Sequence, residues 1–320
     1  MLAFVFPGQG AQTPGFLQPW LAEPGVTDRL TALSEAAGMD LIAHGVESDA
    51  ETIRDTAVAQ PLIVASGLAT LPALLGPDRP AWTVAGAVAG HSVGELAASA
   101  AAGVLTETDA TALVAVRGAA MAEAAAVQPT GMSAVLGGDP EEVSAKLATH
   151  GLTPANMNGS GQVVAAGTLE QLAALAADPP AKARIIPLKV AGAFHTTHMA
   201  PAVTALAERA ATMTVSPART RLLSNADGAV VTDGDEVRSR LVEQVRNPVR
   251  WDLCMETMRT LGVTAVLELP PAGTLVNMIK RALPGVATLA IKTPADLPAA
   301  RALLEEHADV SDLQPSGGAS

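Results

Sequence analysis

One serine in the chain stands in a local sequence that could make its hydroxyl a nucleophile. Ser92 lies in Gly90-His91-Ser92-Val93-Gly94-Glu95, between an apolar run and an alanine-rich stretch of helical composition. In a strand-turn-helix setting, G-x-S-x-G forms a nucleophile elbow, where two glycines permit a sharp turn that exposes the serine hydroxyl. The N–H groups at the start of the following helix could hold an oxyanion. The competing interpretation is a serine that only caps a helix after a glycine turn.

A serine nucleophile needs a general base, and the histidines are the candidates. His91 adjoins the serine, so its side chain is expected to point away from the serine hydroxyl. His150 is expected to end a surface helix, and His307 lies in an acidic segment near the C-terminus. His195 and His198 therefore remain as candidate bases, and the residues alone do not decide between them.

Short apolar runs that alternate with helical stretches predict an α/β fold around this serine. Apolar strands separated by helices indicate a parallel sheet covered on both faces. Strands are expected at residues 2–6, 84–90, 221–225 and 265–269, and helices at 61–75, 93–102, 106–126, 199–213, 235–244 and 250–261.

The middle third of the chain follows a different pattern. It predicts β-α-β-β-α-β, which is the ferredoxin-like unit, with strands at 132–136, 153–158, 162–166 and 183–190 and helices at 140–149 and 169–177. We therefore predict a discontinuous large domain of residues 1–127 and 194–308, an inserted small domain of residues 128–193 and a disordered tail at 309–320. His195 lies at the return to the large domain, and clefts commonly form at such junctions.

Composition restricts the class of protein that carries these elements. Hydrophobic residues make up 49% of the 320 residues and charged residues 16%, so a large core is expected and disorder is not. The net charge of −12 argues against nucleic acid and anionic membranes as partners. The single cysteine, Cys254, excludes a disulfide framework, and no residue spacing predicts a metal site. With no signal peptide and no apolar run expected to span a bilayer, we expect a soluble, cytoplasmic protein and a monomer.

Several short motifs, in order over about residues 1–295, resemble those of the malonyl-CoA:acyl carrier protein transacylase family. The likeness is to the discrete bacterial enzyme of fatty acid synthesis. The matching segments are the opening Phe6-Pro7-Gly8-Gln9-Gly10-Ala11-Gln12, the elbow at 90–95, Val116-Arg117-Gly118, the hairpin at 161–167 with Asn158 ahead of it, Ala193-Phe194-His195, residues 244–251 and Lys280-Arg281.

The resemblance implies a function and a fold. It implies an α/β-hydrolase-like large domain with an inserted ferredoxin-like domain. It implies a ping-pong reaction, in which malonyl passes from malonyl-CoA through malonyl-Ser92 to the phosphopantetheine thiol of acyl carrier protein, for fatty acid and possibly polyketide synthesis. No tightly bound cofactor is implied. The family pattern selects His195 as the base, oriented by a main-chain carbonyl near Gln244, with the N–H groups of Gln9 and Val93 as oxyanion donors.

The resemblance also assigns residues that bind the substrate and the carrier protein. Arg117 is implied to grip the malonyl carboxylate, because a planar guanidinium can bind a carboxylate bidentately. The alternative for Arg117 is a surface helix residue, but its helix neighbours are apolar. Further substrate contacts are expected from His91, Met121, Phe194 and Gln162, any of which could instead be structural. A basic surface for the acidic carrier protein is expected from Lys182, Arg184, Lys189, Lys280 and Arg281.

Other functions fit parts of the same pattern. A plain α/β-hydrolase would usually place its histidine near the C-terminus, where only His307 is available. A trans-acting polyketide acyltransferase or an acyl-thioester hydrolase on the same fold would use the same serine and histidine. A carboxylate-binding Arg117 favours transfer of a carboxylated acyl unit. A non-catalytic scaffold would have no need of nucleophile, base and arginine together.

Overall fold

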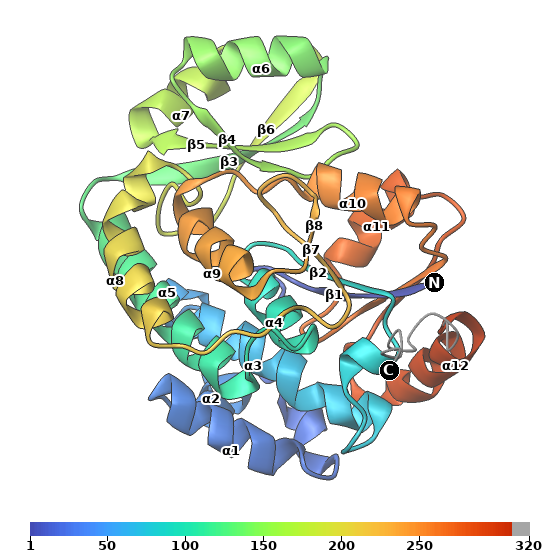
Figure 1. The fold of residues 1–320 in the computed structure, drawn as a ribbon. Coiled ribbons are helices and arrows are strands. Elements are labelled where there is room, and N and C mark those ends of the chain that lie inside the picture. The colour runs from blue at the N-terminus through green and yellow to red at the C-terminus, as the bar shows by residue number, and fades with distance from the viewer. Residues whose placement is uncertain (309–320) are drawn as a thin grey trace.

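The computed structural model describes residues 1–308, which form two separate sheets (Figure 1). The larger sheet has the strand order β10-β9-β1-β2-β7-β8 and is parallel except for the β7–β8 pair. Its strands are β1 (Leu2–Phe6), β2 (Ala87–Gly90), β7 (Arg221–Leu223), β8 (Val230–Val231), β9 (Ala265–Glu268) and β10 (Ala287–Ala290). The predicted parallel sheet between helices is confirmed.

Both faces of the larger sheet are buried, because successive side chains of a strand point to opposite sides. On one face, Phe4 and Leu267 belong to a hydrophobic core that also contains residues of α1 (Val26–Ala37), α3 (Thr56–Leu75), α4 (Gly94–Ala101), α5 (Glu107–Ala126), α8 (Ala200–Ala211) and α12 (Leu297–His307). On the other face, Val5 and Val266 pack against α10 (Trp251–Thr260) and α11 (Leu275–Ala282). The remaining helices of this part are α2 (Leu41–Val46) and α9 (Gly234–Glu243).

Helix α3 is long and apolar enough to cross a membrane by length and composition, which the sequence analysis did not anticipate. In the fold, 78% of its apolar window is buried inside the protein. It packs closely against α5 at Gly118, where an added Cβ would lie 2.8 Å from the carbonyl oxygen of Thr56. The helix begins at Thr56, earlier than predicted, because Asp55 caps it by accepting a hydrogen bond from the Ala57 N–H.

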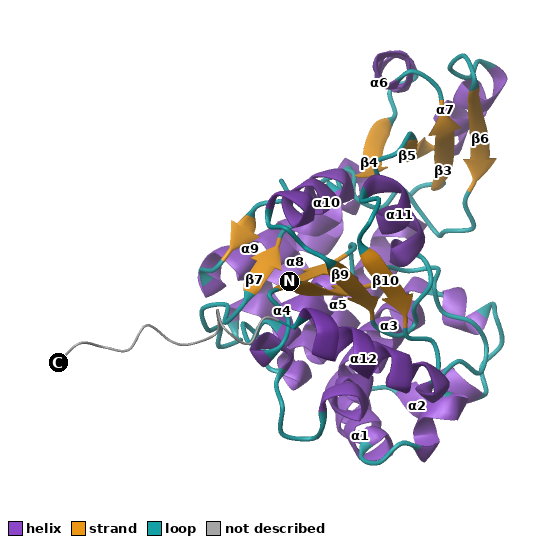
Figure 2. Cartoon of the chain, turned by 90° about the vertical axis from the view of Figure 1, so that its right-hand side faces the viewer, coloured by secondary structure: helices purple, strands orange, loops and turns teal. Residues whose placement is uncertain are grey.

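The smaller sheet is antiparallel, with the strand order β4-β5-β3-β6, and lies above the larger one in Figures 1 and 2. Its elements run β3 (Thr130–Gly137), α6 (Pro140–Thr149), β4 (Thr153–Met157), β5 (Gln162–Thr168), α7 (Leu169–Ala177) and β6 (Ala183–Pro187). Helices α6 and α7 share one core with one face of the sheet. Met132 and Val164, in β3 and β5, belong instead to the core of the larger part. The ferredoxin-like assignment and the domain boundaries at 127/128 and 193/194 stay predictions.

Several elements differ from the sequence-based expectation. Strand β2 is shorter than residues 84–90, because residues 81–83 form a 3-10 turn ahead of it. Helices α1, α2 and α11 and strands β8 and β10 were not predicted. The predicted disordered tail at 309–320 lies outside the described residues.

Candidate active site

The residues around Ser92 form a sharp turn between β2 and α4. Ser92 has φ 53°, in the left-handed region that L residues rarely adopt. The flanking glycines are required by close contacts: a Cβ at Gly90 would lie 2.0 Å from the carbonyl carbon of Gly94, and one at Gly94 would lie 2.2 Å from the Phe6 carbonyl oxygen. The G-x-S-x-G spacing therefore follows from how tightly this turn packs.

Parallel strand register brings three loops together at the carboxyl edge of the larger sheet. Phe6 pairs with Gly90, so the loop after β1 runs beside the serine turn. Gly8 lies against that turn, because a Cβ there would be 3.0 Å from the His91 carbonyl oxygen. The loop after β7 contributes Asn225, whose Oδ1 accepts a 2.7 Å hydrogen bond from the Ser92 N–H.

His195 lies within hydrogen-bonding distance of the serine hydroxyl. Ser92 Oγ is 2.7 Å from His195 Nε2, and His195 Nδ1 is 2.9 Å from the main-chain oxygen of Gln244. A carbonyl oxygen can only accept a hydrogen bond, so Nδ1 carries the proton and Nε2 is left as the acceptor. The pair thus has the geometry for proton transfer from serine to histidine, with a carbonyl in the place where many hydrolases have a carboxylate.

Burial, and next the positive charge of Arg117, lower the pKa of His195 from 6.5 to about 3. We therefore expect the ring of His195 to stay neutral, with its proton on Nδ1, down to about pH 5. Ring ¹⁵N shifts, assigned with a His195→Gln variant, measure this directly. Below pH 6.5 the unfolded chain binds a proton at His195 and the folded chain does not. The contribution of His195 to the free energy of unfolding is therefore full above pH 6.5 and falls as the pH decreases towards 3. A ring that titrates near 6.5 would contradict the burial argument.

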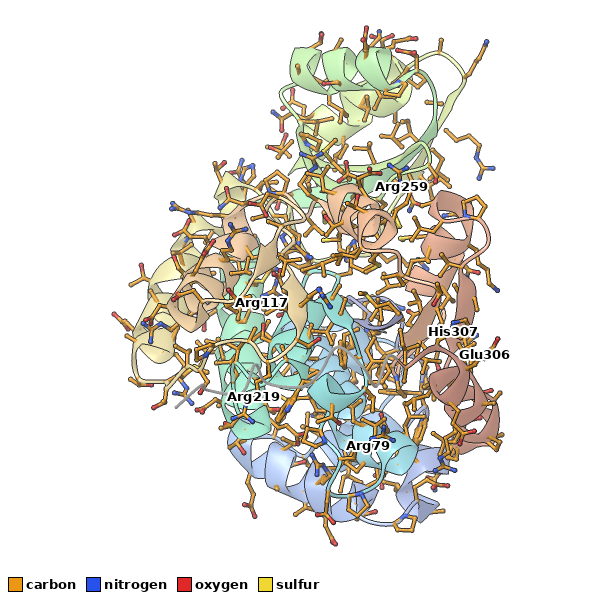
Figure 3. The ribbon with its side chains drawn as sticks, turned by 45° about the vertical axis from the view of Figure 1, so that its right-hand side comes forward. Arg79, Arg117, Arg219, Arg259, Glu306 and His307 are labelled. Atoms are coloured by element: carbon orange, nitrogen blue, oxygen red, sulfur yellow. The ribbon has the colours of Figure 1, made fainter. Side chains whose placement is uncertain are left out.

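The other candidate histidines do not reach the serine hydroxyl. His91 Nε2 lies 3.0 Å from Asn158 Oδ1, and the ring packs edge-on against Trp251. His198 is half-buried and does not line the cavity described below. His307 lies on α12, where Nδ1 is 2.9 Å from Thr264 Oγ1 (Figure 3).

The serine turn leaves one backbone N–H open beside the hydroxyl. The N–H of Ser92 is bonded to Asn225, that of Gly94 to the His91 carbonyl, and that of Glu95 to the Ser92 carbonyl. Within residues 1–308, the N–H groups of Val93 and Gln9 donate to no protein acceptor. Gln9 and Val93 line the same cavity as Ser92, so both N–H groups are available to a developing oxyanion.

Arg117 lies on α5 behind the serine, inside the large part of the molecule (Figure 3), and is 1% exposed. Its guanidinium donates to Gln60 Oε1 at 2.5 Å, to Gln244 Oε1 at 2.8 Å and to Ser92 Oγ at 3.3 Å. Its Nε, also buried, has no hydrogen-bond partner in the described chain. Burial lowers the pKa of Arg117 to about 10, which still leaves a cation at neutral pH.

A cavity of about 260 Å³ opens over the serine and histidine, between the two sheets. Four predicted substrate residues line it: His91, Met121, Phe194 and Gln162. Phe194 is 6% exposed and directly precedes His195. Arg117 is not a wall residue, but its partner Gln60 and the neighbouring Met121 are. The cavity combines apolar walls with polar side chains from both parts of the molecule, such as Gln60, Asn158 and Gln162, as in small-molecule sites generally.

The five predicted docking residues, Lys182, Arg184, Lys189, Lys280 and Arg281, are all exposed and form the basic surface. Within the described part of the chain none of them is ion-paired with a carboxylate. Arg281 donates to Gln162 Oε1 at 3.5 Å. Gln162 and Arg184 both pair with Leu136 of β3, which sets them two strand spacings apart, or about 10 Å. The basic surface therefore borders the cavity.

Three residues of the site were not identified from the sequence. Gln60 accepts a hydrogen bond from Arg117, and Asn225 accepts one from the Ser92 N–H. Glu95 is buried beside these groups. Asn225 ends a predicted apolar strand at the sheet edge where Ser92 lies, which could have marked it. No local pattern marks Gln60, because its role depends on the packing of α3 against α5. The described residues contain no group of three or more His, Cys, Asp or Glu side chains that could hold a metal ion.

Fold and site together place the chain among α/β enzymes that carry a serine–histidine pair at the carboxyl edge of a parallel sheet. The acyl transferase domain family matches residues 3–307, so the chain belongs to that family. It is 53% identical over 303 residues to the malonyl CoA-acyl carrier protein transacylase of Mycobacterium bovis, covering 93% of this chain and 98% of that protein.

Solved structures agree with this family assignment. The crystal structure of MCAT from Mycobacterium tuberculosis superposes with a TM-score of 0.88 at 52% identity, covering 94% of this chain and 99% of that one. A type II PKS malonyl-transacylase solved in complex with its holo acyl-carrier protein superposes with a TM-score of 0.84 at 30% identity, covering 95% and 99%.

Proposed function

We propose that this protein transfers the malonyl group from malonyl-CoA to the phosphopantetheine thiol of an acyl carrier protein, through a malonyl ester of Ser92. The observation that carries the proposal is the Ser92–His195 pair at 2.7 Å with the buried cation of Arg117 3.3 Å from the same hydroxyl. The family and the names of the relatives support it. The proposal places the protein in fatty acid synthesis, and the polyketide relative extends it to that pathway.

In the first half-reaction, Ser92 Oγ attacks the thioester carbonyl while its proton moves to His195 Nε2. The carbonyl oxygen becomes negative and is held by the N–H groups of Gln9 and Val93. The C–S bond then breaks, and coenzyme A leaves as a thiol with the proton from His195. The Gln244 carbonyl stabilises the imidazolium that forms in between, through the Nδ1–H bond.

The second half-reaction runs the same steps with a different thiol. The phosphopantetheine thiol of the carrier protein gives its proton to His195 and attacks the malonyl ester. Ser92 leaves and regains the proton from His195, so the free enzyme is restored. Both half-reactions need only protein groups, the malonyl-CoA thioester and the carrier-protein thiol, so the proposal includes no metal ion and no bound cofactor.

Arg117 is proposed to select acyl groups that end in a carboxylate. Its unsatisfied Nε–H and its closeness to the nucleophile give a malonyl carboxylate a buried, charged partner. A hydrolase for neutral acyl groups would have no use for a buried cation here. This favours transfer of a carboxylated unit over the alternative of acyl-thioester hydrolysis.

The experiment that separates transfer from hydrolysis follows the label of [¹⁴C]malonyl-CoA. We expect the label to appear on holo acyl carrier protein, with free malonate forming at a small fraction of that rate. Apo carrier protein, which lacks the thiol, is the matched control and should receive none. Release mainly as free malonate, with or without carrier protein, would establish a hydrolase instead.

Phe194 is expected to restrict substitution at C2 of the acyl group, because its ring lines the cavity beside the base. Steric selection of this kind is worth about 1–3 kcal/mol, so Phe194→Ser should raise kcat/KM for methylmalonyl-CoA relative to malonyl-CoA by roughly 10- to 100-fold. Competition between the two thioesters for one enzyme sample measures the ratio. If both substrates fall together with the melting temperature, Phe194 only packs the core.

The basic surface is expected to receive the acidic carrier protein against the net negative charge of the chain. Reversing two of its charges, Lys189→Glu with Arg281→Glu, should raise KM for carrier protein by roughly 3- to 10-fold at low salt. The rate of Ser92 acylation by malonyl-CoA should be unchanged. Arg79→Glu is the matched control, because Arg79 is exposed and lies far from the smaller sheet (Figure 3). An equal loss in both half-reactions would show that the surface is structural or binds coenzyme A.

A further inference from the structure

Glu95 is a buried carboxylate beside the serine that the mechanism above does not use. It lies in the first turn of α4 and is 4% exposed. It does not line the acyl cavity. It lines a second cavity of about 340 Å³, together with Ser224, Arg240 and Glu243, and the two cavities share no lining residue. Any effect of Glu95 on the reaction therefore acts through other residues.

One oxygen of Glu95 fixes the side-chain amide of Gln244. Gln244 Nε2 donates to Glu95 Oε2, and also to the Ser92 carbonyl at 3.1 Å, while Gln244 Oε1 accepts from Arg117 at 2.8 Å. A carboxylate only accepts hydrogen bonds and a guanidinium only donates them. The amide can therefore satisfy both neighbours in one orientation only, with its oxygen towards Arg117.

The other oxygen of Glu95 supports the loop that holds the serine turn. Glu95 Oε1 accepts from the Asn225 N–H at 3.2 Å. The Asn225 side chain in turn accepts from the Ser92 N–H and donates to the Gly90 carbonyl, both at 2.7 Å. One carboxylate is thus two hydrogen bonds away from both the nucleophile turn and the arginine.

The charges of Glu95 and Arg117 are a second reason to connect these two residues. Arg117 is a buried cation that makes hydrogen bonds only to neutral groups in the described chain. The charge of Glu95 acts to raise the pKa of Arg117 against the effect of burial. An uncompensated buried charge is strongly destabilising. The Gln244 amide lies between the two ions with its dipole aligned to both.

We propose that Glu95 is a positioning residue that, through Gln244, holds the Arg117 guanidinium in the orientation that receives the carboxylate of the acyl substrate. The inference rests on the proposed function in one respect, the role of Arg117 towards that carboxylate. It adds that acyl selectivity depends on a residue that no acyl group touches.

The first test replaces Glu95 by glutamine, which keeps the shape and turns one acceptor into a donor. The new side chain has only one acceptor oxygen for Gln244 Nε2 and the Asn225 N–H, so either the Asn225 bond is lost or Gln244 rotates its amide and turns a donor towards Arg117. Burial raises the pKa of Glu95 to about 7, so the test is made at about pH 8.5, where the wild-type carboxylate is ionised. There we expect the kcat/KM ratio of malonyl-CoA to acetyl-CoA to fall at least tenfold. Acetyl-CoA, which has no carboxylate, should change less than threefold. Glu243→Gln, the same change in the same second cavity, is the control and should leave the ratio unaltered.

The second test measures unfolding instead of activity, so that it stands even if the proposed function fails. In a double-mutant cycle of Glu95→Gln and Arg117→Met, the first change leaves the buried Arg117 cation without the charge that compensates it, and the second removes that cation. The double variant is therefore expected to melt well above the temperature that adding the two single effects gives. Should Glu95→Gln alone not fold, recovery of folding in the double variant supports the pairing. Additive melting effects, or an equal loss of malonyl- and acetyl-CoA activity in Glu95→Gln, would overturn the proposal.

Discussion

Ser92→Ala should abolish the malonyl-enzyme and lower transfer by a factor on the order of 10⁶, the scale typical of losing a serine nucleophile. The fold should be kept, because alanine at φ 53° meets the same backbone constraint as serine and only a hydroxyl is removed. Stopped reactions with malonyl-CoA, read by intact-mass spectrometry, measure the adduct, and a melting curve measures the fold.

The matched control for this change is Ser99→Ala. Ser99 is a buried serine on α4, the helix that follows the serine turn, and its hydroxyl donates to the main-chain carbonyl of Glu95 at 2.7 Å. Its loss removes one buried hydroxyl without touching the cavity, so the adduct should form as in the wild type. A full adduct on the Ser92→Ala protein would assign the nucleophile to another residue.

Arg117→Ala should lower kcat/KM for malonyl-CoA by about 10²–10⁴-fold, because removing one partner of a buried charge pair costs about 3–5 kcal/mol. Acetyl-CoA leaves no buried charge unpaired in this variant, so its kcat/KM should hold or rise. The measurement is the ratio of the two kcat/KM values at saturating carrier protein. It reports on the acyl end alone, since the two thioesters share the coenzyme A part.

Arg117→Lys is the informative companion, since it keeps the charge and loses the planar fork. We expect it to fall between wild type and Arg117→Ala for malonyl-CoA. Nε of Arg117, which has no partner in the described chain, is the donor that lysine cannot replace. Equal losses for malonyl- and acetyl-CoA in both variants would show that Arg117 supports the fold and does not select the acyl group.

Local patterns were enough to locate the nucleophile and its turn. Gly90 and Gly94 are required by contacts within the turn and with the end of the neighbouring strand. The G-x-S-x-G motif is therefore enough to predict the conformation of the turn. Helices α6 and α7 begin where predicted, because Asp139 and Thr168 cap their first turns and leave a clear local signal.

The supporting residues could not be found in the same way. Arg117 meets Gln60 only because Gly118 lets α5 approach α3, and it meets Gln244 across 127 residues of sequence. Helix α2 and the edge strand β10 are too short to show a periodic pattern, and α1 begins after Gly25 without a side-chain cap, so its start has no local signal. The choice of His195 over His198 needed the family resemblance, since both lie in one short segment. The geometry places only His195 at Ser92 Oγ.

The most direct test of the account isolates the acyl-enzyme and follows its fate. The protein is treated with [¹⁴C]malonyl-CoA, freed of coenzyme A, and divided between digestion for peptide mapping and mixing with holo acyl carrier protein. We predict that the label maps to Ser92 and moves to the carrier protein as coenzyme A-free malonyl thioester, leaving unmodified enzyme. Label on any other residue, or label that stays on the enzyme or appears as free malonate when the carrier protein is added, would contradict a transfer that passes through malonyl-Ser92.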